Sequence, residues 1–305
     1  RTLGLIAIGV VVLAVFVFVE NRTARPMLDV SLFRNMRFTA ASGSITIGFF
    51  TLAGFSFLMT QYFQLIHGFT PLGTGVRLLP VAISIAVAAV LGTRLAVGIG
   101  NKAVVAAGLT MFGAFMFWVA TVSRSTPYFI IVGQMILGGG GLGLITAPAT
   151  EAIMGAVPKE KAGIGSAVND ATRLFGAALG VAVMGSIAAS LYGSRLAANL
   201  PKGLPSQTFA AAKGSVGGAL VVVQSMQRAG LSGLARELRF ASTGAFLHSM
   251  SGAMIVAGTV AMLGALMAAL FLPSRPGLGL APTTIVRVEE SADIDLDSPS
   301  AESVS

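Results

Sequence analysis

The chain has 305 residues, of which 54% are hydrophobic and only 10% are charged, and its mean hydropathy is +0.84. This composition excludes an ordinary soluble domain. The net charge of +8 does not indicate a nucleic-acid partner, because the basic residues lie between long apolar runs, where they anchor and orient membrane helices. The sequence has no cysteine, which excludes disulfides and thiol nucleophiles.

Long apolar runs are the main structural signal. A bilayer core of about 30 Å requires about 20 apolar residues per helix. In chain order, the runs of that length cover residues 2–19, 38–63, 74–97, 103–122, 128–153, 163–191 and 244–272. Runs this long satisfy their backbone hydrogen bonds as helices, whereas barrel strands would be about ten residues long and would alternate. The predicted fold class is an all-α membrane protein, a helical bundle.

Polar breaks divide the chain into four parts. Residues 1–20 form one transmembrane helix, and residues 21–37 form an amphipathic linker along the inner leaflet. Residues 38–272 form a six-helix unit with an external loop at 192–243, in which short surface helices are possible. Residues 273–305 are acidic and lack aromatic residues, so we expect a disordered cytoplasmic tail.

Basic residues cluster in alternate loops, which sets the expected orientation. They are Arg22, Arg25, Arg34 and Arg37, then Arg94 and Lys102, then Lys159 and Lys161, and finally Arg275 and Arg287. We therefore expect a multi-pass protein of the cell membrane with a cytoplasmic C-terminus. Arg1 opens directly on an apolar run without a methionine or a cleavage site, so we expect the natural N-terminus to lie elsewhere.

Four stretches resemble a known family in their order and spacing. They are Glu20-Asn-Arg-Thr-Ala-Arg-Pro-Met-Leu-Asp-Val-Ser-Leu-Phe-Arg34 before Phe38; Gln61-Tyr-Phe-Gln64, His67-Gly68 and Pro71-Leu-Gly-Thr-Gly75 up to Leu79-Pro80; Gly138 to Gly143; and Val157-Pro158, Gly163-Ile-Gly-Ser166 and Gly180-Val-Ala-Val-Met-Gly-Ser186. Together they resemble the 14-helix drug:proton antiporter branch of the major facilitator superfamily.

The resemblance implies that part of the transporter lies outside this sequence. Residues 1–20 would be the second of two extra central helices, and the following six helices would be the C-terminal half of a major-facilitator bundle. The missing N-terminal half of the same polypeptide would then be a partner, together with protons, the lipid bilayer and a small lipophilic substrate. The implied function is proton-driven export of amphipathic drugs, which we expect to be cationic. No cofactor is implied.

One loop departs from the superfamily pattern. The segment Gly92-Thr-Arg94-Leu-Ala-Val-Gly98-Ile-Gly100-Asn-Lys102 lacks the Asp-Arg pair of the cytoplasmic gate motif. Arg94 and Lys102 keep positive charge there. We expect these two residues to anchor the loop rather than to form a charge-relay gate.

Polar groups inside the sixth run are the main functional candidates, because ionisable side chains at membrane depth are costly. Asp170 and Arg173 lie about 10 to 15 Å into that helix and can form an ion pair at i,i+3 spacing. Ser166 and Asn169 extend the polar stripe. Either the two charges merely neutralise each other, or Asp170 attracts a cationic substrate or exchanges a proton while Arg173 controls its pKa.

Residues near the external ends of the helices have weaker signals. Gln61 and Gln64 can hydrogen-bond a substrate or close an outer gate, although a plain interfacial role explains them equally well. Arg77 is expected to extend outward to the interface. His67 and His248 are too far apart in sequence to indicate a metal site, so each is interpreted as an interfacial residue.

Glycines and prolines inside the runs indicate close packing or bending. Gly139 and Gly143 lie in a helix segment almost free of side chains, and Gly176 and Gly180 extend the face that carries Asp170. The helix positions Pro80 and Pro148 remove backbone hydrogen bonds and predict kinks. Hinge motion for alternating access and simple helix packing both explain this pattern.

Other functional classes have less support. No Ser/His/Asp constellation, phosphate loop or metal cluster occurs at membrane depth, so we expect no catalytic residues, no metal and no enzyme activity. Export of a lipid-like compound or a natural metabolite remains an alternative within the same fold. A membrane sensor or scaffold remains the alternative from another class.

Overall fold

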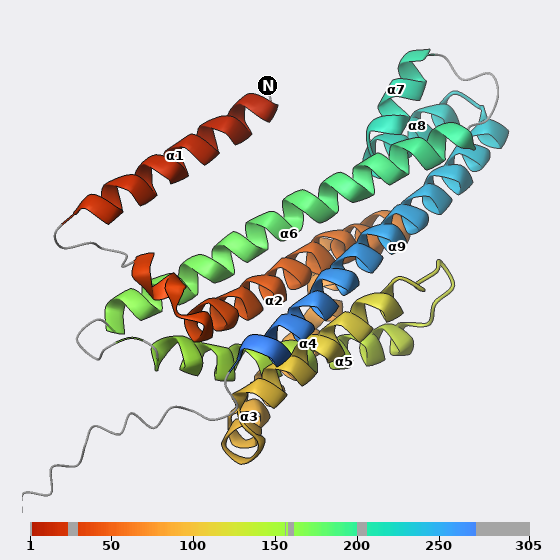
Figure 1. The fold of residues 1–305 in the computed structure, drawn as a ribbon. Helices are drawn as coiled ribbons and strands as arrows, with labels where there is room; N and C mark the ends of the chain where they lie inside the picture. The colour runs from red at the N-terminus through yellow and green to blue at the C-terminus, as the bar shows by residue number, and fades with distance from the viewer. Residues whose placement is uncertain (1, 24–29, 156, 158–161, 200–205, 273–305) are drawn as a thin grey trace, which may run out of the picture.

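The computed structural model describes residues 2–23, 30–155, 157, 162–199 and 206–272, and these ranges are helical without any strand (Figure 1). Among them, six helical segments are long and apolar enough to cross a membrane. They are Met36–Ile66, Pro71–Ile99, Asn101–Val119, Tyr128–Met154, Ala162–Ala198 and Ser232–Phe271. The predicted all-α membrane fold is confirmed.

The helices follow the predicted order of apolar runs. In chain order they are α1 (Thr2–Arg22), the 3-10 helix η1 (Val30–Arg34), α2 (Met36–Gln61), the π-helix η2 (Tyr62–Ile66), α3 (Pro71–Ile99), α4 (Asn101–Val119), α5 (Tyr128–Met154), α6 (Ala162–Ala198), α7 (Ser206–Gly214), α8 (Val216–Arg228) and α9 (Ser232–Phe271). Each predicted run coincides with one of these helices. Figure 1 shows α1 apart from the bundle. The predicted linker lies partly, and the acidic tail entirely, outside the described residues.

Local chemistry explains where several helices begin. The Thr70 hydroxyl accepts a hydrogen bond from the Gly73 amide at 3.1 Å, and Pro71 occupies the first turn of α3, where its missing N–H costs nothing. Ser215 caps α8 in the same way and separates it from α7. Between α3 and α4, Gly100 adopts a φ of +90°, a conformation that side-chain-bearing residues rarely take. These breaks set the lengths of the helices.

Two helices continue well beyond the membrane. α9 has 40 residues and α6 has 37, which correspond to lengths of about 60 and 55 Å, whereas the hydrocarbon core is about 30 Å thick. Their extensions occupy both ends of the region predicted as an external loop at 192–243. Apolar runs mark only the part of a helix inside hydrocarbon, so hydropathy does not reveal such extensions. The helices α7 and α8 pack at this same end of the bundle (Figure 1).

Glycines let neighbouring backbones approach closely in the bundle. A Cβ added at Gly139 would lie 2.5 Å from the Val81 carbonyl oxygen of α3, and one at Gly143 would lie 2.6 Å from the Cβ of Ala88. On α6, a Cβ at Gly180 would collide with the Phe50 carbonyl oxygen of α2. The glycines therefore close the contacts of α5 with α3 and of α6 with α2.

The two proline-containing helices remain continuous. Pro80 lies inside α3 and Pro148 lies inside α5, each without interrupting its helix. The carbonyl oxygen of Pro148 accepts a hydrogen bond from the Asn101 side-chain amide at 3.3 Å, which ties the start of α4 to α5. Hinge motion at either proline stays a prediction.

Burial differs among the spans. α3 and α6 bury the smallest share of their apolar windows, whereas α4 and α5 bury the largest. α5 packs against both α3 and α4, and it lies within the bundle. The large exposed apolar side chains of α3 and α6 include Val76, Ile83, Leu174 and Phe175. These two helices therefore present the most open surface of the described bundle.

Candidate substrate and proton site

A side-chain hydrogen-bond network joins α5 and α6 at membrane depth. The Thr150 hydroxyl of α5 donates to the Asn169 carbonyl oxygen Oδ1 at 3.2 Å, and Arg173 Nη2 donates to the same hydroxyl oxygen at 3.2 Å. We call these three residues the polar seam. α5 and α6 share few other contacts, so the polar seam is a principal connection between them.

Arg173 holds a partly buried positive charge in this network. Its guanidinium lies over the Phe49 ring of α2, 5.3 Å from the centroid, which is a cation–π geometry. Its Nε atom is buried and has no hydrogen-bond partner in the described part of the chain. The Thr150 hydroxyl and the Phe49 ring carry no negative charge, so they do not neutralise the guanidinium. Arg173 can therefore bind a further partner that is anionic or a strong hydrogen-bond acceptor.

Asp170 lies beside the network but outside it. Its side chain is exposed, and within the described residues it forms no hydrogen bond or ion pair, including none with Arg173. The i,i+3 spacing therefore does not produce the ion pair that it allows. The carboxylate faces open space at the same level as the polar seam.

Helix geometry explains how the predicted stripe divides. At about 100° per residue, Ser166, Asn169, Asp170 and Arg173 occupy an arc of about 100°. Asn169, at one edge of the arc, is buried against α5, whereas Ser166 and Asp170, toward the other edge, are exposed. Sequence reasoning grouped the four residues correctly but missed Thr150, their partner on α5. A threonine in an apolar helix is a weak signal because it commonly bonds its own preceding turn.

Gly176 and Gly180 continue the Asn169 side of this arc toward the other end of α6, where the helix packs against α2. Added Cβ atoms at these positions would collide with the carbonyl oxygens of Thr46 and Phe50 in α2. Of the two sequence-based interpretations, close helix approach describes their position, and no open path runs along them.

The two predicted glutamines lie at the opposite end of the bundle from Asp170. Gln61 is the last residue of α2 and lines a cavity of about 170 Å³ together with Tyr192 and Ser249. Gln64 is half-buried in η2, a π-helix, and such helices occur frequently at functional sites. The Tyr192 hydroxyl donates to the Ala212 carbonyl at 3.1 Å, which holds the α7–α8 segment over this cavity. The structure therefore does not bring the glutamines and the aspartate together.

His67 follows η2 in an aromatic cluster at this end. Its ring stacks on the Phe69 ring with 5.7 Å between the ring centroids, and it meets the Tyr62 ring edge-on with 4.7 Å between the centroids. Partial burial, followed by the positive charges of Arg124 and Arg77, lowers the pKa of His67 below its ordinary value. Arg77 itself donates to the Gly73 carbonyl at 3.0 Å and lies over Phe69, so it stays at the end of its helix as predicted.

Buried amides form a further polar feature that the search for ionisable residues missed. The Gln134 Nε2 of α5 donates to the Trp118 carbonyl at 3.0 Å, while its Oε1 is buried without a partner. The Asn101 Oδ1 is buried and unpartnered in the same way. A glutamine inside an apolar run is a recognisable signal, because buried polar groups require partners. Within the described ranges, no three His, Asp or Glu side chains converge as metal ligands would.

Comparison with known proteins finds relatives that are named as drug-resistance, efflux or export proteins. No protein-family model matches the chain. It is 33% identical over 192 residues to the multidrug resistance protein Stp of Mycobacterium tuberculosis, which covers 63% of this chain and 36% of that protein. It is 30% identical over 260 residues to the multidrug efflux pump LfrA of Mycolicibacterium smegmatis, covering 85% of this chain and 51% of LfrA.

A third relative is the tetracenomycin C resistance and export protein of Streptomyces glaucescens, with 26% identity over 281 residues, 90% of this chain and 52% of that protein. The chain spans about half the length of LfrA and of this relative, and a smaller share of Stp.

The six apolar spans and the relatives together define a multi-pass membrane protein. The relatives are drug-resistance and efflux proteins of the major facilitator type, and their similarity extends over most of this chain.

Proposed function

We propose that the full-length protein exports amphipathic, cationic drugs across the cell membrane in exchange for protons. The proposal rests on two ionisable side chains one turn apart on α6. Asp170 is exposed and forms no hydrogen bond or ion pair among the described residues, and the charge of Arg173 is incompletely neutralised. Ionisable groups in this position are functional candidates because they are costly to retain. The relatives named as multidrug efflux proteins support the substrate class.

Competition for one carboxylate links export to the proton gradient in this proposal. Deprotonated Asp170 attracts a cationic substrate, and protonation of Asp170 removes the charge that holds it. Arg173 lies one turn away on the same helix. The polar seam holds Arg173 near α5 through Thr150. A change in the α5–α6 contact would then alter the electrostatic environment of Asp170.

The proposal includes an orientation and a second half. Basic loops alternate along the sequence, which supports a cytoplasmic C-terminus. The open surfaces of α3 and α6 are suited to contact with the other half of a major-facilitator bundle. Because the chain spans only about half of several relatives, we expect transport to require the complete polypeptide.

Proton-coupled dye transport in inverted vesicles tests this function. We expect full-length protein to accumulate a cationic dye under a proton gradient and to release protons when the dye is added. Asp170→Asn should abolish both signals while the protein still reaches the membrane. The matched control is Glu151→Gln, which removes an exposed carboxylate at the end of α5 and should keep both signals. Transport by Asp170→Asn at the control's rate would remove the proposed role of Asp170.

Natural-product export is the second candidate. The observation that favours it is the similarity to the tetracenomycin C resistance and export protein, which extends over 90% of this chain. The same vesicles distinguish the two candidates. Uptake of neutral polycyclic compounds that competes with the dye and persists in Asp170→Asn would favour natural-product export over cation export.

A further inference from the structure

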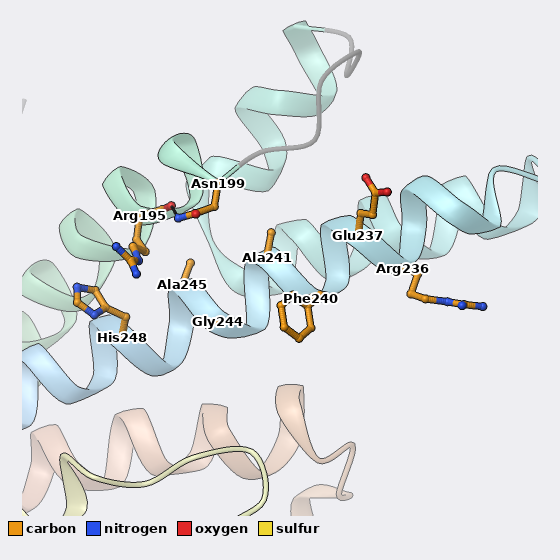
Figure 2. Close-up of a pocket in the computed structure, with 9 residues that line it drawn as sticks. All are labelled: Arg195, Asn199, Arg236, Glu237, Phe240, Ala241, Gly244, Ala245 and His248. Atoms are coloured by element: carbon orange, nitrogen blue, oxygen red, sulfur yellow. Dashed lines mark hydrogen bonds between the residues drawn. The ribbon is translucent and has the colours of Figure 1, made fainter.

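A groove lies between α6 and α9 at the end of the bundle that carries α7 and α8, away from the polar seam (Figure 2). Its volume is about 670 Å³. It is lined by Arg195 and Asn199 from α6 and by Arg236, Glu237, Phe240, Ala241, Gly244, Ala245 and His248 from α9. Nothing in the transport proposal uses these residues.

The position of the groove relative to the membrane can be inferred from the contact between α6 and α9 at its floor. A Cβ added at Gly252 of α9 would lie 2.5 Å from the Leu191 side chain of α6, so the two helices touch there and close the floor. Arg195 follows Leu191 by one turn, and His248 precedes Gly252 by one turn. His248 lies about 35 Å from the last residue of α9, just beyond a hydrocarbon core of about 30 Å. Arg195 lies one turn beyond the apolar run 163–191, and His248 lies one turn inside the run 244–272, so we infer that both side chains are near the membrane interface.

Two nitrogen-bearing side chains face each other across this level. Figure 2 shows the Arg195 guanidinium and the His248 imidazole extending into the groove from opposite helices. Both residues are exposed, and within the described ranges neither side chain forms a hydrogen bond or an ion pair. Glu237 lies about 16 Å farther out along α9, too far to neutralise them. At the level of Arg195 and His248 no carboxylate lines the groove, and the guanidinium offers several donors, which suits a phosphate group.

The surfaces below the groove indicate where the phosphate comes from. On the membrane side of His248, the apolar side chain of Ile255 lies on the same face of α9 and is exposed. A phospholipid placed with its phosphate in the groove would lay its acyl chains along these helices. A soluble phosphate would make no use of that apolar surface.

We propose that the α6–α9 groove binds the phosphate of an anionic phospholipid in the adjacent leaflet, with Arg195 and His248 as its ligands. Basic pockets between transmembrane helices at headgroup level bind anionic lipids through this chemistry. The space beside Gly244 is open, because a Cβ added there would meet no atom within 4 Å, so a larger side chain at this position would occupy the groove.

Native mass spectrometry of the purified full-length protein, titrated with phosphatidylglycerol or phosphatidylcholine, tests the site. We expect phosphatidylglycerol to bind the unmodified protein preferentially, and Arg195→Gln to weaken that binding about fivefold. Arg239→Gln is the matched control, because it removes an exposed arginine from the same region without lining the groove. Gly244→Leu keeps every charge and fills the space, so it should also lower the affinity.

Other outcomes would overturn the proposal. Equal phosphatidylglycerol binding by Arg195→Gln, Gly244→Leu and Arg239→Gln would place the lipid elsewhere. Displacement of the lipid by millimolar inorganic phosphate, with phosphate alone bound equally well, would assign the groove to a soluble anion. These measurements involve no transport, so they are independent of the proposed export activity.

Discussion

Two levels along α6 contact neighbouring helices by opposite means. Toward α2, Gly176 and Gly180 bring backbone against backbone, with no room for a methyl group. Toward α5, contact depends on the hydrogen bonds of the polar seam. The first contact fixes the separation of two helices, because packed surfaces have no alternative partners. The second can exchange its partners with water or with another polar group.

The difference separates structural from mobile parts of the bundle. Proteins switch between arrangements where a contact has two comparable states, and a hydrogen-bond network at an open surface meets that condition better than a glycine-packed contact. We therefore expect α6 to move with α2 and to change its relation to α5. Variants at the two levels should therefore differ both in the kind of effect and in its size.

The largest effect should come from Gly180→Ala. The added methyl group collides with the Phe50 carbonyl oxygen, so the α2 and α6 backbones must separate. We expect about 1 to 3 kcal/mol of destabilisation, measured as a lower melting temperature of the detergent-purified protein. Gly163→Ala, where an added Cβ meets nothing within 4 Å, is the control in the same helix. Equal melting temperatures for the two variants would contradict the assigned close contact.

A smaller effect is expected for Thr150→Val, which tests the polar seam. The substitution keeps the shape but leaves Asn169 Oδ1 without its donor and Arg173 Nη2 without its acceptor. We expect a loss of about 1 kcal/mol, because these hydrogen bonds are only part-buried and water can replace some of the lost bonding. Thr110→Val is the control, because that hydroxyl bonds only its own preceding turn on an exposed face of α4. Matching stabilities would show that the seam is not a significant connection.

His67, at the end of the bundle that carries η2, should make the stability of the protein sensitive to acid. The lowered pKa of His67 means that the unfolded chain takes up a proton at a higher pH than the folded chain does. Stability should therefore fall as the pH drops below about 6.5, the ordinary pKa of histidine. Melting curves from pH 7.5 to pH 5 should show a shallower loss for His67→Gln than for the unmodified protein. An unchanged slope would assign the acid sensitivity to other groups.

The smallest effect on stability is expected for Asp170→Asn. The carboxylate is exposed and unpartnered among the described residues, so its removal should change the free energy of unfolding by no more than about 0.5 kcal/mol. Denaturation in detergent measures this change. A large destabilisation would mean that Asp170 is a structural member of the polar seam, and the loss of transport would then no longer isolate its chemistry.

Sequence reasoning was most successful where one helix decides the outcome. The apolar runs lie within the observed helices almost throughout, although α3 begins at Pro71, three residues before its predicted run. It was least successful where two helices meet. The acceptor for Arg173 is Thr150, which lies 23 positions earlier in the chain, and only the packing of α5 beside α6 reveals the pair.

Features of a single helix could be predicted and contacts between helices could not, and this difference has a physical cause. Transfer into hydrocarbon depends on composition over about 20 residues, so the sequence by itself determined the membrane class, the helical fold and the depth of Asp170 and Arg173. Direction around a helix depends on its neighbours. Only the tertiary structure decided that Gly180 faces α2, that Arg173 bonds α5 while Asp170 stays open, and that Arg195 faces His248 across a groove.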